Sequence, residues 1–534
     1  MRRPLAGTLL TLGAAAAVLN PLRNFPLDDD WCYFIEARRL LHEHVLRLLD
    51  SAPSTQVAHV AWGALVGSVF GLSHGALRVS TLCLAAVALA TFARLAGGKD
   101  DRVATSPVFL LMANPLFFVL SFTYMTDVPF LAWSLIAAAL YLEADAKGRD
   151  ALLLAGSAAA SWAYLIRQHG MLLPLAALAF LSLRGRLTAR RAALAALLPA
   201  LTVLAHRYWF LRVHGVTWSG EVYLRRGTLL HLSHPLRFAW DFYTRAAGLA
   251  LELGLFSLPS ILALNLGGEA RRPGAKALLA LLAGILPFLL VGGGFPYQAH
   301  VLWARGLGAC SLSGAEFKAA GLLGSPWFLS AMTVLSIASL AGWLARGREL
   351  RGAAEEPAVQ FLALAGALMV GASFLGEQYF DRYGLPLLPG ALLLAARAAS
   401  VRPSGRRWPA AVAGVLFLLW SIAGTWDYLN WSEARWRAGT AAADAGIPAD
   451  RLFNGLEWTA LNVYERNMSA LKARKPLAEI GEWEWLTGQD FVAETSFSPR
   501  PPDGERRILD VPYRTPLSLE TRRVYVYART PRRP

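Results

Sequence analysis

Long apolar blocks, each near the thickness of a lipid bilayer, recur along most of the 534 residues. A helix needs about 20 mostly apolar residues to cross the hydrocarbon core of a membrane. Hydrophobic residues make up 55% of the sequence and charged residues 17%, whereas a soluble protein carries about 25% charge. This composition argues strongly against a soluble enzyme, a disordered protein and a coiled coil. The runs are continuous rather than alternating, so we expect an all-α polytopic membrane protein and not a β-barrel.

About thirteen transmembrane helices fit the apolar blocks. The first block follows Arg2 and Arg3, and we interpret it as an uncleaved span rather than a secretory signal. The expected spans cover residues 5–20, 76–96, 104–122, 128–143, 150–166, 170–183, 192–212, 242–264, 276–293, 325–345, 357–375, 384–398 and 408–425.

Positive charge is distributed unevenly over the loops between these spans. The formal net charge is +15, which in a soluble protein would suggest nucleic acid. Here the basic residues gather in alternate short loops, as the positive-inside rule requires of cytoplasmic loops, so no nucleic acid partner is expected. These loops lie at residues 2–3, 94–102, 147–149, 184–191, 271–276, 346–351 and 397–407. We therefore expect a multi-pass protein of the cell inner membrane, with its N-terminus in the cytoplasm.

One apolar block does not fit this alternation. Residues 57–72 could span the membrane, but every later loop would then change sides and the arginine-rich loops would face outward. We therefore expect residues 31–72 to form helices that lie on the outer surface. The segment Trp31–Leu49 supports this, because Phe34, Leu41, Val45 and Leu48 share one helical face.

The composition changes after residue 425. No later run could cross a bilayer, and residues 507–511 and 523–528 are typical of short strands. We expect two domains: a membrane domain over 1–425, and a small extracytoplasmic α/β domain over 426–534.

Three adjacent carboxylates, Asp28, Asp29 and Asp30, follow the first span directly. They either bind a cation, or include a base with a raised pKa, or form an exposed turn that caps the surface helix. A second acidic position, Asp127, lies at another outer span boundary. Asp127 either caps the helix that begins there or converges with the triplet on one pocket.

Two arginines stand at outer boundaries of later spans. Arg382 is followed by Tyr383, and Arg167 is followed by Gln168 and His169. A guanidinium at the membrane surface suits a phosphate group, although anchoring at the interface is the alternative. No His, Cys and Glu spacing supports zinc, and no Walker loop or nucleophile elbow is present.

Four short motifs resemble those of the GT-C glycosyltransferases, particularly the family-39-like group of protein O-mannosyltransferases and lipid A aminoarabinose transferases. Asp29-Asp30-Trp31-Cys32-Tyr33 resembles an Asp-(Asp/Glu)-x-x-Tyr element after the first span, and residues 71–80 resemble the loop before the second. Asp127 stands like the second acidic site, and residues 382–386 resemble a late Arg-Tyr-x-Leu-Pro element. The resemblance covers residues 1–400. Asp30 stands where Glu is common, and the tail matches no known pattern.

The resemblance implies transfer of a hexosyl or pentosyl group from a polyprenyl-phosphate donor to a lipid, glycan or protein acceptor on the outer face, with inversion. Arg382, Arg167 and Tyr383 would bind the donor phosphate. Asp29 would be the base, while Asp30 and Asp127 would orient the acceptor or, with Asp28, bind a divalent cation. Two alternatives stay open: a transporter or flippase for a lipid-linked sugar, and a non-catalytic scaffold.

Overall fold

The computed structural model describes residues 2–52, 55–97, 105–265, 273–318, 321–400, 408–501, 505–517 and 519–529. Parts of three basic loops expected in the cytoplasm, residues 98–104, 266–272 and 401–407, lie outside these ranges.

Each predicted span contains a helix in the described chain. The helices are α1 (Arg2–Leu19), α4 (His74–Ala96), α5 (Pro107–Ala113), α6 (Pro115–Ser121), α7 (Asp127–Lys147), α8 (Asp150–Ile166), α9 (Leu172–Leu183), α10 (Ala189–Tyr208), α12 (Pro235–Asn265), α13 (Ala275–Leu290), α14 (Pro326–Ala345), α16 (Pro357–Ser373), α17 (Leu388–Ser400) and α18 (Trp408–Asp444).

The exact number of spans is not confirmed. Within the described ranges, six helices are long and apolar enough to cross a membrane, or seven if α15 (Gly347–Ala354) and α16, which are bent by 96°, form one span. Five further apolar helices have 10–17 residues. The helical character of the predicted spans is confirmed.

One predicted span is broken in the middle. Residues 104–122 form α5 and α6 instead of a single helix. Pro115 begins α6, and a residue before proline is pushed out of the helical region, so Asn114 is extended. The Asn114 side chain then accepts the backbone N–H groups of Leu116 and Phe117 at 3.0 and 3.1 Å, which caps α6.

The segment between the first two predicted spans is helical in part. α2 (Asp30–His42) and α3 (Val57–Phe70) cover most of it. The helix predicted over Trp31–Leu49 ends earlier than expected, at His42, and His44 has a left-handed backbone with φ of 56°.

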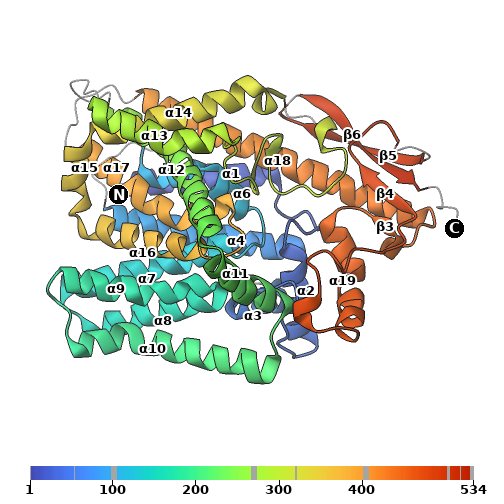
Figure 1. Ribbon diagram of the computed structural model, residues 1–534, viewed down its shortest axis with the longest axis horizontal. Coiled ribbons are helices and arrows are strands. Elements are labelled where there is room, and N and C mark those ends of the chain that lie inside the picture. Colours follow the sequence, from blue (N-terminus) through green and yellow to red (C-terminus); the bar gives the residue numbers. More distant parts are fainter. Residues whose placement is uncertain are drawn as a thin grey trace.

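The predicted cytoplasmic loops approach one another at one end of the helical bundle. Arg94 pairs with Glu143, and Arg184 pairs with Asp145 at 3.0 Å. Figure 1 shows α7, α8, α9 and α10 lying side by side, with the strands of the tail at the opposite side of the molecule from the N-terminus. These loops therefore lie at the opposite end of the molecule from the strands of the tail.

The tail contains a small mixed sheet. Its strands run in the order β3 (Leu452–Phe453), β4 (Ala493–Ser496), β6 (Glu520–Ala528) and β5 (Arg506–Thr515), with β3 parallel to β4 and the other pairs antiparallel. Both predicted strands are confirmed. α18 continues through residue 425, so the predicted domain boundary falls inside this helix (Figure 1); the division into two domains stays a prediction.

The shorter elements connect these parts. They include α11 (Gly227–Ser233), α19 (Leu456–Lys472), the hairpin of β1 (Leu302–Trp303) and β2 (Gly306–Leu307), and the helical turns η1 (Gln168–Met171), η2 (Trp209–His214), η3 (Gly220–Arg226), η4 (Ala315–Phe317), η5 (Gly321–Gly324), η6 (Asp381–Leu387), η7 (Ala449–Arg451) and η8 (Leu477–Glu479).

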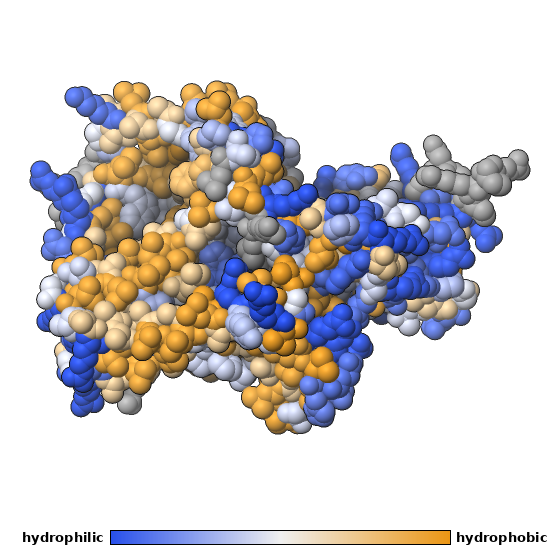
Figure 2. All heavy atoms as spheres, turned by 60° about the horizontal axis from the view of Figure 1, so that its bottom comes forward, coloured by the Kyte–Doolittle hydropathy of each residue, from blue (hydrophilic) through white to orange (hydrophobic). Residues whose placement is uncertain are grey.

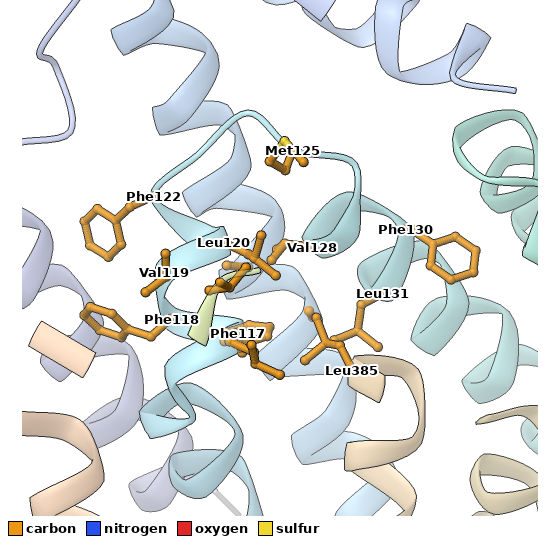
Figure 3. Packing of buried hydrophobic residues seen from close by; sticks show 14 of the residues in the cluster. Phe117, Phe118, Val119, Leu120, Phe122, Met125, Val128, Phe130, Leu131 and Leu385 are labelled. Atoms are coloured by element: carbon orange, nitrogen blue, oxygen red, sulfur yellow. The ribbon is translucent and has the colours of Figure 1, made fainter. Parts of the chain in front are cut away.

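Apolar side chains cover much of the helical part and also fill its centre. In Figure 2 the helical part is largely orange, and blue residues gather over the smaller lobe and at the opposite tip. Figure 3 shows the core beneath the loop that carries Met125: Leu131 and Leu385 point toward one another, and Phe130 points away. This core fixes the start of α7, and with it Asp127.

Candidate active site

The segment that carries Asp28, Asp29 and Asp30, called the acidic loop below, is held in place by the motif at residues 71–80. Arg78 is fully buried and donates to the backbone carbonyls of Pro21, Arg23 and Phe25 at 2.9–3.0 Å. Gly75 lies against the same loop, because a Cβ there would be 2.5 Å from the Leu22 carbonyl oxygen. The motif therefore holds the chain immediately before the three carboxylates.

Asp28 and Asp29 point toward the late arginine. Arg382 Nη1 lies 3.5 Å from Asp28 Oδ2, and Nη2 lies 3.5 Å from Asp29 Oδ2. The Asp29 side chain is 38% exposed, whereas that of Asp28 is 12% exposed. Of these two carboxylates, Asp29 is the more accessible to a second substrate.

Asp30 makes different contacts. Its carboxylate accepts the backbone N–H of Tyr124 at 2.9 Å and that of Leu27 at 3.3 Å. Asp30 is buried at 1% exposure. The sequence placed Asp30 with the catalytic group, but its contacts tie the acidic loop to the loop before α7.

Asp127 joins the two arginines. Its Oδ1 pairs with Arg167, and its Oδ2 lies 3.7 Å from Arg382 Nη1. The Tyr383 ring lies 5.2 Å from the Arg167 guanidinium carbon and 5.8 Å from that of Arg382. Residues expected at one outer site thus meet, although they come from four separate segments of the chain.

Two neighbours of this group were not singled out from the sequence as site residues. His300 Nε2 lies 3.6 Å from Asp28 Oδ2. Asp381 accepts the backbone N–H groups of His300, Val301 and Leu302 at 2.6–3.2 Å, which fixes this outer loop beside Arg382. Asp381 could have been recognised in the sequence because it directly precedes Arg382. The sequence marks His300 only by its position in a long outer loop.

Burial changes the acid–base properties of the group. Burial raises the pKa of Asp28 to about 6 against the opposing charge of Arg382. Burial and the charge of Asp28 raise the pKa of Asp29 to about 6, again opposed by Arg382. Burial, with a smaller effect of the Asp28 charge, outweighs the charge of Arg78 and raises the pKa of Asp30 to about 8. Burial and Arg382 lower the pKa of His300 to about 4, so this imidazole is neutral at pH 7.

A pocket opens beside the two arginines and encloses about 330 Å³ of empty space, including its mouth. Its polar lining is Asp127, Arg167, His169, Ser373, Arg382 and Tyr383, and its apolar lining is Phe130, Leu131, Met369, Leu385 and Pro386. His169 also contacts the Ser373 hydroxyl at 3.1 Å. A pocket that is cationic on one wall and apolar on another suits a phosphate attached to a hydrocarbon chain.

The geometry does not favour a metal ion here. Among the residues that the structure describes, no three His, Cys, Asp or Glu side chains are grouped to hold one. Arg382 occupies the position among Asp28, Asp29 and Asp127 where a cation would provide positive charge. We therefore assign no chemical step to a divalent cation.

Comparisons with known proteins agree with this architecture. Residues 59–209 match the family model described as dolichyl-phosphate-mannose-protein mannosyltransferase. ArnT from Cupriavidus metallidurans, solved with undecaprenyl phosphate bound, is similar with a TM-score of 0.50 and 11% identity, and the match covers 98% of each chain. The apo state of that protein gives a TM-score of 0.34 and 15% identity over the same shares. No curated protein sequence matches the chain.

The structure is that of a multi-pass membrane protein with a GT-C-like fold, similar to that of ArnT, and a small strand-containing tail. The resemblance to the GT-C glycosyltransferases, seen first in the short motifs, is confirmed by the family match and by the fold.

Proposed function

We propose that this protein is a membrane glycosyltransferase that moves a hexosyl or pentosyl group from a polyprenyl-phosphate donor to an acceptor on the extracytoplasmic face of the inner membrane. The observation that carries the proposal is the meeting of Asp28, Asp29 and Asp127 around Arg382, next to a pocket with one cationic and one apolar wall.

Arg382, Arg167 and Tyr383 are the proposed ligands of the donor phosphate. Both arginines line the pocket, and planar guanidinium groups suit phosphate oxygens. The first isoprene units would lie against Phe130, Leu131 and Leu385, which are apolar members of the same lining. The relative ArnT was solved with undecaprenyl phosphate, a ligand of this chemistry.

Asp29 is the proposed base. It is the more exposed of the two carboxylates that face Arg382, and a pKa of about 6 leaves it mostly ionised yet basic at neutral pH. The acceptor hydroxyl would give its proton to the Asp29 carboxylate while its oxygen forms a bond to the anomeric carbon. The bond between that carbon and the phosphate oxygen breaks, and its electron pair leaves on the phosphate, which Arg382 and Arg167 stabilise.

Asp127 and Asp30 have supporting parts in this proposal. Asp127 pairs with Arg167 and lies beside Arg382, so it orients both phosphate ligands. Asp30 positions the acidic loop against Tyr124. Orientation of the acceptor falls to Asp28 and Asp29, and the acceptor class is a lipid, a glycan or a protein.

The decisive experiment uses the purified wild type and Asp29→Asn in liposomes that contain lipid-linked sugars extracted from the native membrane. We expect labelled sugar to reach an acceptor with the wild type and at least about 100-fold more slowly with the variant. Asp50→Asn is a matched control, because Asp50 pairs with Lys472 away from Arg382. Equal transfer by Asp29→Asn would refute the role of the base. Movement of the lipid across the bilayer without sugar transfer would favour the flippase alternative.

A further inference from the structure

The Glu457 side chain links the tail to the acidic loop. Glu457 is the second residue of α19, and its Oε1 accepts the backbone N–H of Asp28 at 3.2 Å. The Glu457 side chain is 4% exposed. A group from the tail therefore binds the main chain at the first of the three acidic residues.

The conformation of Asp28 explains why its N–H needs this acceptor. Asp28 has φ of 55°, a left-handed backbone that residues other than glycine adopt rarely. Such a conformation persists only where its surroundings hold it, and the Asp28 N–H is partly buried, so a protein acceptor offsets its lost hydration. Glu457 supplies that partner, and Arg78 holds the carbonyls just before it.

Glu457 is itself fixed from the other side. Its Oε2 accepts from Arg435 Nη1 at 2.6 Å, and the Arg435 side chain is fully buried. Gly455 makes room for this pair, since a Cβ there would be 2.3 Å from Arg435 Nη1. Arg435 also lies over the Trp431 ring at 5.5 Å. The tail thus holds the Glu457 carboxylate in a fixed position. One of its oxygens pairs with Arg435, and the other accepts a hydrogen bond from the acidic loop.

We propose that Glu457 is a positioning residue of the transferase, which acts through the Asp28 backbone to aim the acidic loop at Arg382. The inference rests on the proposed function. Asp28 Oδ2 lies 3.5 Å from Arg382 and 3.6 Å from His300, so rotation of the Asp28 main chain would move a carboxylate away from both. The tail is on this account a part of the active site rather than an appended domain.

The test compares full-length wild type, Glu457→Gln and the control Glu465→Gln in nanodiscs. Glu465 lies on the same helix and also crosses to α2, by its pair with Arg39, but it does not touch the acidic loop. In Glu457→Gln we expect kcat to fall at least about tenfold, because the neutral glutamine amide has one acceptor oxygen for two donors, the Asp28 N–H and Arg435 Nη1, and cannot keep both charge-assisted hydrogen bonds. The KM for the lipid donor should stay within about twofold, since neither Glu457 nor Asp28 belongs to the pocket lining. The control should keep both values.

Hydrogen exchange of residues 27–30 gives a second readout that does not depend on activity. We expect these amides to exchange at least about tenfold faster in Glu457→Gln and at the wild-type rate in Glu465→Gln. Unchanged exchange at 27–30, or faster exchange throughout the chain, would overturn the inference, whatever happens to kcat. Faster local exchange in a protein whose wild type transfers no sugar would instead refute only the proposed function.

Discussion

Arg382 Nη2 lies 3.5 Å from Asp29 Oδ2, so the proposed phosphate ligand and the proposed base share one ion pair before any substrate binds. The charge of Arg382 lowers the pKa of Asp29 against the effect of burial. A donor phosphate that binds Arg382 would weaken this effect. Donor binding should therefore make Asp29 a stronger base, which couples the two substrates without any large movement of the chain.

This coupling predicts two different pH profiles. In the free enzyme the pKa of Asp29 is about 6, so kcat/KM should fall as the pH drops below about 6. In the donor complex Arg382 is shared with the phosphate, and the acid limb of kcat should lie at higher pH. Steady-state rates between pH 5 and 9 measure both limbs. An acid limb of kcat that lies below that of kcat/KM would contradict the coupling.

Replacing Arg382 should weaken binding of the lipid donor. We expect Arg382→Gln to raise the Kd for polyprenyl phosphate about 10- to 100-fold, since a hydrogen bond to a charged group contributes about 1.5–3 kcal/mol. Arg382→Lys should recover only part of this, because an ammonium lacks the planar fork. Calorimetry in detergent measures the Kd. Arg397→Gln is the control, as Arg397 pairs with Glu356 at the other end of the bundle.

Gly75→Ala should disturb the acidic loop without touching a carboxylate. The added Cβ would lie 2.5 Å from the Leu22 carbonyl oxygen, so the backbone must move. Overpacking of this kind costs about 1–3 kcal/mol, and we expect transfer to fall while insertion into the membrane persists. Thermal unfolding and transfer are measured together. In Gly13→Ala, where nothing lies within 4 Å of the new Cβ, both should be unchanged.

Two buried carboxyls should make the protein less stable as the pH rises. These carboxyls are Glu36 and Asp30, and burial raises the pKa of each to about 8. Glu36 accepts hydrogen bonds from the Leu49 N–H at 2.6 Å and from the Gln56 side chain at 2.5 Å. The unfolded chain loses these protons near pH 4, so between about pH 4 and 8 the folded protein binds more protons. Stability should fall across this window by up to about 1.4 kcal/mol per pH unit for each group.

Thermal unfolding at pH 5.5 and 8 checks this dependence. Glu36→Gln should reduce the slope but not abolish it, because position 36 then has no proton to lose while Asp30 still titrates. Glu43→Gln, which is exposed just beyond the end of the same helix, should retain the wild-type slope. A melting temperature that rises between pH 5.5 and 8 would show that the sign is wrong.

The helices were predictable because apolar run length and loop charge depend on local sequence alone. The break at Pro115 shows the limit: hydropathy averages over a proline, although its missing N–H ends a helix. The grouping of Asp28, Asp127 and Arg382 was predictable from their common side of the membrane. The orientation of Asp30 was not, since it depends on a contact with Tyr124 that no spacing encodes.

The residues that contact the acidic loop were even harder to predict from the sequence. Glu457 lies in a segment that matched no known pattern, and its contact with Asp28 requires the tail to fold back onto the membrane domain. His300 reaches the site only because Asp381 holds its loop. Such long-range contacts are set by tertiary packing, and a single sequence does not contain them as local patterns.

Helix α18 has 37 residues, which corresponds to a length of about 55 Å. The hydrocarbon core of a bilayer is about 30 Å thick, so a large part of this helix extends beyond it. The part of α18 beyond residue 429 lies against β5, through the contacts of Asn430 with Arg514 and of Arg437 with Pro512, and so holds the strands of the tail beside the acidic loop. Because the tail also contacts Asp28 through Glu457, a bulky acceptor would have to reach Asp29 from a side that the tail does not cover.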